Sequence, residues 1–251
     1  MTAFKSVVIA AGFAVIGATG AEAATFDALG DFSTANTPGS VWAYGDGIVG
    51  STFNALPIKQ VLTLSTNWLS NDAANVPANL GVPAVIKNTS GNVFVAANIV
   101  YTLDTLIIHP GPRSDVIVQF TAPAAGNYSY SGLFEILDGD RPTGIVAKIF
   151  QNGLSVFEQA LAGGLSNRAN TSNKTPGTSL QFSNTIFLAA GDKLSFAANN
   201  GGNFTFDSTG FQVTITSDSV SAIPLPATWM LMFTGLAGVG LLGRGKSQRT
   251  V

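Results

Sequence analysis

Cysteine is absent from this chain of 251 residues, and histidine occurs only once. Without cysteine, a disulfide framework, a thiol nucleophile and a thiolate metal site are all excluded. One histidine also excludes a zinc site built from several histidines. Charged residues make up only 10% of the chain. Because the few basic residues form no cluster in the central region, we expect neither nucleic acid nor anionic lipid as its partner.

Familiar catalytic motifs are missing as well. The sequence contains no Gly-x-Ser-x-Gly elbow, P-loop or dinucleotide-binding glycine pattern. His109 lies beside Pro110 at the end of an apolar run, where a turn or a core hydrogen bond competes with a catalytic role. A glycosidase needs two facing carboxylates, about 5 to 9.5 Å apart. Nothing in the sequence pairs Glu135 or Glu158 with a second acid, and both are expected on solvent-facing strand positions.

Alternation of apolar and polar residues is the main structural signal. Runs 116–120, 128–136 and 211–215 each place their apolar residues on one face of a predicted strand. Asn152-Gly153 separates two apolar runs and predicts a tight hairpin, because both residues tolerate positive φ. Short strands broken about every 8 to 12 residues by Gly, Asn, Asp and Pro predict an all-β fold. We expect an antiparallel two-sheet β-sandwich of the jelly-roll type.

The first part of this domain alternates less clearly. Strands are predicted there only at Thr52-Phe53, Thr63-Leu64 and Val93 to Val100. Gly163 to Gly177 has few apolar residues and is predicted to form a long exposed loop.

The N-terminus has the three parts of a secretory signal peptide. Lys5 provides a basic start, residues 7–18 are apolar, and Ala21-Glu22-Ala23 fits the small-x-small rule for signal peptidase. The apolar run is too short for a retained membrane anchor. The sequence therefore predicts a signal peptide over 1–23, with cleavage after Ala23.

The C-terminus has an ordered layout of its own. Pro224, Leu225 and Pro226 begin an uncharged stretch of apolar or small residues that reaches Gly243, and basic residues then follow. At about 1.5 Å rise per residue, this stretch is just long enough to cross a bilayer core as one helix. The basic tip is expected to stay cytoplasmic.

This order of Pro motif, hydrophobic helix and basic tail resembles the PEP-CTERM sorting signal of Gram-negative bacteria. Leu225 stands where the name motif has Glu, which resembles the VPLPA-type subgroup. The resemblance implies that an exosortase-type membrane protease recognises the motif and releases or transfers the preceding domain. An ordinary tail anchor or stop-transfer helix is the alternative.

Both signals together divide the chain into three parts: the signal peptide, a mature domain at 24–222 and a C-terminal sorting signal at 223–251. The mature domain carries 8 Lys and Arg against 13 Asp and Glu, a net charge of −5. About 200 residues are enough to bury a core without disulfides. We expect export through the inner membrane to the cell surface or extracellular matrix.

Several phrases in the middle region resemble secreted bacterial modules with a galactose-binding-like or carbohydrate-binding-like jelly roll. They are Asp31 to Ser33, Val41 to Gly45, Leu106 to Gly111, Phe120 to Tyr128 and Phe206 to Gly210. The resemblance implies a β-sandwich of the kind attached to exported polysaccharide or surface proteins. It names no substrate.

Two sets of residues are candidates for ligand binding. Asp138 and Asp140 flank a glycine and offer hard oxygen ligands to calcium, although Asp-Gly-Asp also forms simple turns. Trp42, Tyr44 and Trp68 are candidate glycan-binding residues, because aromatic planes stack on the apolar faces of sugars. Packing in the core is the alternative for all three rings. No other cofactor is expected.

Two functions follow from these observations. The first is a non-enzymatic surface or matrix protein whose sandwich is structural or binds polysaccharide weakly. The second is a polysaccharide-active hydrolase or lyase with an Asp/Glu site. The scarcity of His, Glu and Lys favours the first.

Overall fold

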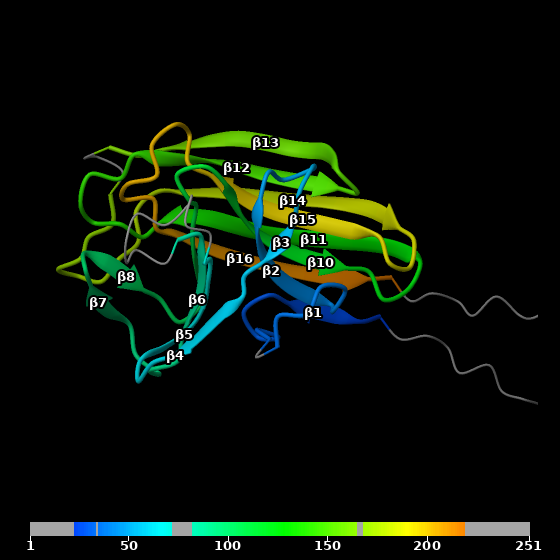
Figure 1. The fold of residues 1–251 in the computed structure, drawn as a ribbon, viewed down its shortest axis with the longest axis horizontal. Helices are drawn as coiled ribbons and strands as arrows, with labels where there is room; N and C mark the ends of the chain where they lie inside the picture. The colour runs from blue at the N-terminus through cyan, green and yellow to red at the C-terminus, as the bar shows by residue number, and fades with distance from the viewer. Residues whose placement is uncertain (1–22, 34, 72–81, 165–167, 219–251) are drawn as a thin grey trace, which may run out of the picture. The chain divides into compact units, whose positions relative to one another are not determined.

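Two antiparallel β-sheets lie face to face with the core between them (Figure 1). The computed structural model describes residues 23–33, 35–71, 82–164 and 168–218, and Ala23–Asp218 forms one compact unit. The predicted sorting motif Pro224 to Pro226 and cleavage-site residue Ala21 lie outside the described residues. No helix in the described part of the chain is long and apolar enough to cross a membrane. The predicted C-terminal helix also lies outside that part.

The larger sheet has the strand order β14-β11-β16-β9-β6-β5-β4, and β1 pairs with β16 beside this path. Its strands are β1 (Thr25–Asp27), β4 (Ile58–Val61), β5 (Ser65–Leu69), β6 (Ala84–Asn88), β9 (Leu106–His109), β11 (Gly126–Ile136), β14 (Ser179–Leu188) and β16 (Thr209–Ser217). Every pairing within the sheet is antiparallel.

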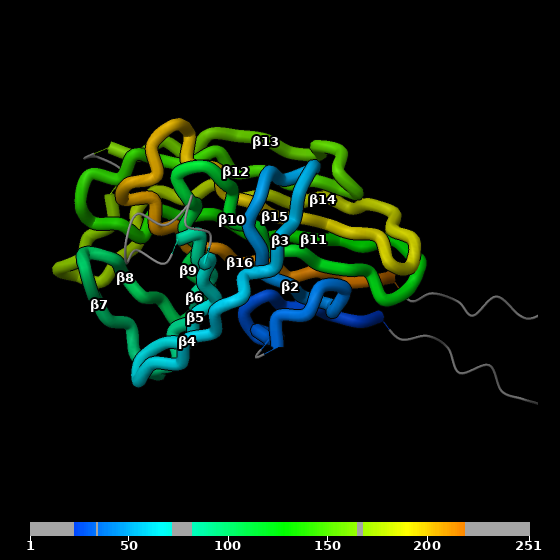
Figure 2. Tube along the Cα trace, in the orientation of Figure 1, coloured from blue at the N-terminus to red at the C-terminus, as the bar shows by residue number. Residues whose placement is uncertain are grey.

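The smaller sheet has the order β13-β12-β15-β10-β2-β3. Its strands are β2 (Trp42–Gly47), β3 (Asn54–Ala55), β10 (Asp115–Thr121), β12 (Gly144–Gln151), β13 (Leu154–Ala162) and β15 (Lys193–Asn199). A separate hairpin consists of β7 (Phe94–Ala96) and β8 (Ile99–Tyr101). The tube in Figure 2 shows the chain passing repeatedly between the two sheets. The expectation of an all-β, two-sheet antiparallel sandwich is confirmed.

Aromatic side chains from both sheets fill the core. Phe196 on β15 contacts Tyr130 on β11 and Phe211 on β16, with ring centroids 5.8 and 5.5 Å apart. Phe134 and Phe211 meet within the larger sheet at 5.1 Å. Such offset and edge-to-face contacts add to the free energy of burial. The apolar residues that alternate in the sequence therefore define the inner faces of the strands, as predicted.

One turn and one strand position show why particular residues are needed. Asn152 and Gly153 connect β12 to β13 with φ of 48° and 87°, which confirms the predicted tight hairpin. In the middle of β11, a Cβ at Gly132 would lie 2.0 Å from the backbone oxygen of Gln212. Only glycine therefore allows β16 to approach β11 this closely.

The sequence predictions for the first part of the domain were largely wrong. Thr52-Phe53 is not a strand, because Thr52 is held in a turn by hydrogen bonds between its amide and hydroxyl groups and the backbone of Ile48. Thr63-Leu64 forms the turn between β4 and β5, closed by the bond from the Leu62 amide to the Ser65 carbonyl. Val93 to Val100, in contrast, does contain strand residues, because β7 and most of β8 lie within it as a hairpin.

The predicted loop over 163–177 is described only outside 165–167. Its described residues contain no β-strand, although Asn170 forms an isolated antiparallel β-bridge with Thr175. Ala169 is an exception to the expected exposure, because it is buried against Val100 and Leu137.

Candidate functional site

The outer face of the larger sheet, which points away from the core, has two unlike halves. Over β14, β11 and β16 it is a flat surface of short polar side chains. Over β9, β6 and β5 it is covered by the β7–β8 hairpin and by residues 204–208, and a pocket lies beneath them. We call these the hydroxyl face and the side pocket.

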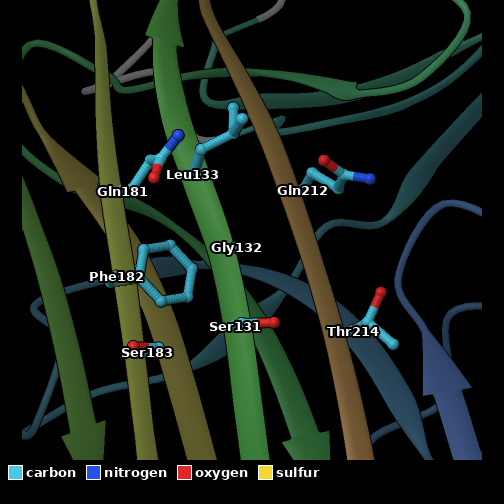
Figure 3. A pocket seen from close by; sticks show the side chains of 8 residues that line it. All are labelled: Ser131, Gly132, Leu133, Gln181, Phe182, Ser183, Gln212 and Thr214. Atoms are coloured by element: carbon cyan, nitrogen blue, oxygen red, sulfur yellow. The ribbon is translucent and has the colours of Figure 1, made fainter.

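The hydroxyl face consists of rows of side chains in register across three strands. Opposite Ser129 lie Thr185 and Thr216, and opposite Ser131 lie Ser183 and Thr214. Figure 3 shows this second row and, one step along the strands, the row Gln181, Leu133 and Gln212. Two adjoining hollows of about 400 and 320 Å³ lie on this face, and no charged residue is among the described residues that line them.

The side pocket has a volume of about 540 Å³, within the range of small-molecule sites. Its floor and walls are mostly apolar. They comprise Leu69, Val82, Ala84, Ile86, Ala97, Ile99, Tyr101, Ile107, Phe204 and Phe206. The polar residues that line it are Gln60, Asn67, His109, Asp138, Thr205 and Ser208. Several elements far apart in the sequence therefore form one concave site.

Phe206 adopts an unusual backbone conformation at this pocket. Its φ is +59°, which is rare for a bulky residue, and its side chain is 43% exposed. Tyr101 is half-buried in the same pocket and stacks on Phe94 at 4.4 Å. Strained backbone is often found at functional sites, because the surrounding structure holds it for a purpose other than stability. With Phe204, the pocket thus offers one exposed and two partly buried aromatic rings.

Asn67 has an unused acceptor in this pocket. Its Nδ2 donates to Gln60 Oε1 at 3.1 Å, while its Oδ1 is buried without a hydrogen-bond partner in the protein. A buried acceptor without a partner costs free energy, so such a group points to a ligand or another function.

His109 adds a second acceptor. Its Nδ1 lies 2.7 Å from the carbonyl oxygen of Pro110, which can only accept, so Nδ1 carries the proton. Burial lowers the pKa of His109 below its usual value, although the bond to Pro110 acts in the opposite direction. The ring is therefore neutral at pH 7, and Nε2 is left with a lone pair.

Asp138 is the carboxylate of the side pocket. It accepts hydrogen bonds from Ser208 Oγ and from the backbone amide of Asp140, both at 3.2 Å. Burial raises the pKa of Asp138 to about 6. Asp207 lies nearby but does not line the pocket. Thr143 Oγ1 donates to its Oδ1 at 2.6 Å, and burial raises the pKa of Asp207 to about 7.

The three aromatic residues predicted to bind glycan lie in the core. Trp42, Tyr44 and Trp68 are only 2%, 0% and 7% exposed. Trp68 Nε1 donates to the carbonyl of Ser33, whose amide in turn donates to the Tyr44 hydroxyl. Tyr44 and Trp68 thus have hydrogen-bond partners for their polar groups, whereas Trp42 Nε1 has none. All three rings are buried, so none offers a free face to a sugar.

Asp138 and Asp140 are close together, but as parts of a turn. The bond from the Asp140 amide to Asp138 Oδ1 joins residues two apart in the chain. Among the described residues, no group of three or more His, Asp or Glu side chains gathers in a way that could hold a metal ion.

The two glutamates differ from each other. Glu158 is exposed on β13, as expected, whereas Glu135 is half-buried. Burial and then the charge of Asp104 raise the pKa of Glu135 to about 7. Neither glutamate lines the side pocket.

Sequence reasoning missed most of the side pocket. It identified His109 and Asp138 as residues of interest but did not bring them together. Neither the unused acceptor of Asn67 nor the positive φ of Phe206 can be predicted from a single sequence. The only available signal was the concentration of apolar residues at 106–108.

Comparison with known proteins gives distant structural matches only. No family model matches the chain, and no curated protein matches it. One similar structure is CBM51 from Clostridium perfringens GH95 in complex with methyl-galactose, at 12% identity and a TM-score of 0.30, covering 50% of this chain and 78% of that one. Another is a family 35 carbohydrate binding module from Clostridium thermocellum, at 16% identity and a TM-score of 0.27, covering 50% and 82%.

A third match is dimeric latent PorU from Porphyromonas gingivalis, at 12% identity and a TM-score of 0.30, covering 42% of this chain. The matched part spans only 10% of the PorU chain, and 12% of a Clostridium perfringens ZmpB structure that carries CBM51 domains. The chain thus has a distant likeness to the β-sandwiches of carbohydrate-binding modules.

Proposed function

We propose that this protein is a non-enzymatic surface or extracellular-matrix protein whose sandwich binds polysaccharide weakly. One observation carries the binding: the side pocket combines an apolar floor, an exposed aromatic ring and a buried acceptor without a partner, Asn67 Oδ1. A sugar presents the complementary chemistry, since its ring has apolar faces and its edge carries hydroxyl donors. Few polar groups face the ligand, so binding per copy is weak, and many copies on one surface would add avidity.

The strand order supports the jelly-roll topology within this proposal. Strands β9 to β16 contribute β14-β11-β16-β9 to the larger sheet and β13-β12-β15-β10 to the smaller one. Two four-stranded sheets that alternate along the chain in this order are the arrangement of a jelly roll of eight strands. Strands β4, β5 and β6 then extend the larger sheet and contribute residues to the side pocket.

Export and sorting belong to the proposal through the two ends of the sequence. Ala21-Glu22-Ala23 fits a signal-peptidase site, and Pro224-Leu225-Pro226 with the following apolar stretch fits a signal read by an exosortase-like protease. Intact-mass measurement of the native protein should show loss of residues 1–23 and of the C-terminal apolar stretch. A mature species that still carries Trp229 to Val251 would contradict the sorting proposal.

Hydrolysis is less well supported than binding. A two-carboxylate mechanism needs a second acid facing the first across the substrate. Among the described residues that line the side pocket, Asp138 is the sole carboxylate.

Affinity electrophoresis on bacterial exopolysaccharides tests this function. The full-length protein should be retarded, and Phe206→Ala should lose the retardation because the exposed ring is removed. Phe187→Ala is the matched control, since Phe187 is 62% exposed on β14 and does not line the side pocket. Reducing-sugar release should be measured in parallel. Release that Asp138→Asn abolishes would show a hydrolase, and retardation unchanged in Phe206→Ala would exclude the side pocket as the binding site.

A further inference from the structure

The charge of the side pocket limits which sugars it can hold, and this inference rests on the proposed function. The described residues that line it include no Lys or Arg. His109 is neutral, because burial lowers its pKa and its Nδ1 proton is bound to the Pro110 carbonyl. Asp138 therefore carries the only formal charge in the described lining, and that charge is negative at neutral pH.

Asn67, His109 and Asp138 present acceptors to the pocket, whereas the Gln60 amide and the Tyr101 hydroxyl are donors in its lining. Asn67 Oδ1 has no partner, and Asn67 Nδ2 is already bound to Gln60. His109 offers a lone pair on Nε2, and Ser208 uses its hydroxyl proton on Asp138. A ligand must consequently bring hydrogen-bond donors. A carboxylate, sulfate or phosphate group brings only acceptors when ionised and would leave Asn67 unpaired.

The acceptors are also spread across the sheet. Asn67 lies on β5 and His109 on β9, with β6 between them. Two strand spacings and an offset of two residues along the strands separate their backbones by about 12 Å. Several separate donors, such as the hydroxyls around a sugar ring, can reach both positions, whereas the donors of one ammonium group point from a single atom.

We propose that the side pocket binds uncharged sugar residues through their hydroxyl donors and discriminates against acidic sugars. The apolar floor formed by Ala84, Ile86 and Ile107 receives one face of the ring. Asn67, His109 and Asp138 accept from its hydroxyls. An acidic sugar meets the Asp138 carboxylate in a site that has no cation to compensate it.

Paired sugars test this selectivity with the full-length protein. Calorimetric titration would compare methyl glucoside with methyl glucuronide and methyl galactoside with methyl galacturonide, and glucosamine would serve as the cationic arm. The uncharged member of at least one pair should bind about tenfold tighter than its acid, as expected for one lost hydrogen bond to a buried group. Tighter binding of the uronides would overturn the selectivity while leaving sugar binding in place. A preference of tenfold or more for glucosamine over glucose would make the site an amine site instead.

Two variants connect the selectivity to named residues. Asn67→Leu should weaken binding of the uncharged sugar about tenfold, because it removes the unused acceptor at similar volume. Thr205→Lys places a cation on an exposed lining residue and should reduce the preference for uncharged sugars. Thr214→Val on the hydroxyl face is the control and should change neither quantity. If Asn67→Leu does not fold, Thr205→Lys alone tests the selectivity. An unchanged preference for uncharged sugars in that variant would contradict the electrostatic explanation.

The result also separates this selectivity from the proposed function. Binding of no sugar by the wild-type protein, together with no retardation on any polymer, would refute both. Sugar binding that is equal within each pair would refute only the selectivity.

Discussion

The two halves of the larger sheet's outer face belong to one hydrogen-bonded ladder but differ in what lies over them. The hydroxyl face over β14, β11 and β16 has short side chains in flat rows and nothing above them among the described residues. The side pocket over β9, β6 and β5 has a hairpin and a loop above it. A ligand on the flat face would keep much of its water, whereas one in the pocket would exchange water for protein contacts on several sides. The segments that cover the sheet therefore distinguish the candidate site.

The covering segments also change the electrostatics. Removal from water raises the pKa of Asp138 to about 6 and lowers that of His109. Because both shifts favour the neutral forms, covering the sheet makes the pocket less charged than its sequence alone indicates.

Gly132→Val should have the largest effect, because its side chain would disrupt the backbone pairing of β11 and β16 beneath the hydroxyl face. An added Cβ would lie 2.0 Å from the Gln212 backbone oxygen and 2.7 Å from Phe182, so β11 and β16 must separate. We expect a loss of about 4 kcal/mol or more in the free energy of unfolding, or failure to fold. Urea denaturation would measure it. Ser131→Ala, the exposed neighbour, should stay within about 0.5 kcal/mol, and equal losses in both variants would contradict the close-approach explanation.

Asp207→Asn should have the next largest effect, on the pH dependence of stability. Asp207 lies near the side pocket. Burial raises the pKa of Asp207 from 3.8 to about 7, so the folded state holds this proton more tightly than the unfolded state does. Wild-type stability should therefore fall as pH rises from about 4 to 7, and the fall due to Asp207 is at most about 4 kcal/mol. Chemical denaturation across this pH range should show a flatter profile for Asp207→Asn. A profile unchanged from wild type, or one matched by Asp218→Asn at an exposed site, would contradict this role.

The same comparison explains how far the sequence could predict the structure. Strands β11 and β16 have one face in the core and one in solvent, so their side chains alternate and the sequence reveals them. Strand β9, which lies beneath the side pocket, is buried on both faces over Leu106 to Ile108. Burial on both faces removes the alternation. The segments that create the side pocket thus also remove the sequence signal of the strands beneath it.

The candidate binding residues show the same limit. Trp42, Tyr44 and Trp68 were chosen for their chemistry, but burial decides whether a ring can meet a sugar, and all three are in the core. Under the proposed function Phe206 takes that role, because its loop holds it at the pocket with φ of +59°. Only the folded chain brings it beside Asn67 and His109.

Changes to the hydroxyl face should have little effect on polymer binding. Neither Ser131 nor Thr214 lines the side pocket. We expect the double variant Ser131→Ala with Thr214→Val to retain polysaccharide within about twofold of wild type, which corresponds to about 0.4 kcal/mol. Quantitative affinity electrophoresis would measure it. A loss as large as that of Phe206→Ala would reverse the comparison and make the flat half the binding surface.

An equally small effect is expected at Asp140, where the calcium hypothesis and the turn make opposite predictions. Asp140 contributes a backbone amide to Asp138, and a change of its side chain leaves that bond in place. We therefore expect Asp140→Asn to change the free energy of unfolding by no more than about 0.5 kcal/mol. Added calcium should shift the Tm of the wild-type protein by no more than about 1 °C. Scanning calorimetry with calcium and with a chelator would measure both. A calcium-dependent rise in Tm that Asp140→Asn removes would show that the two aspartates hold calcium, since binding to the folded state alone raises Tm by mass action.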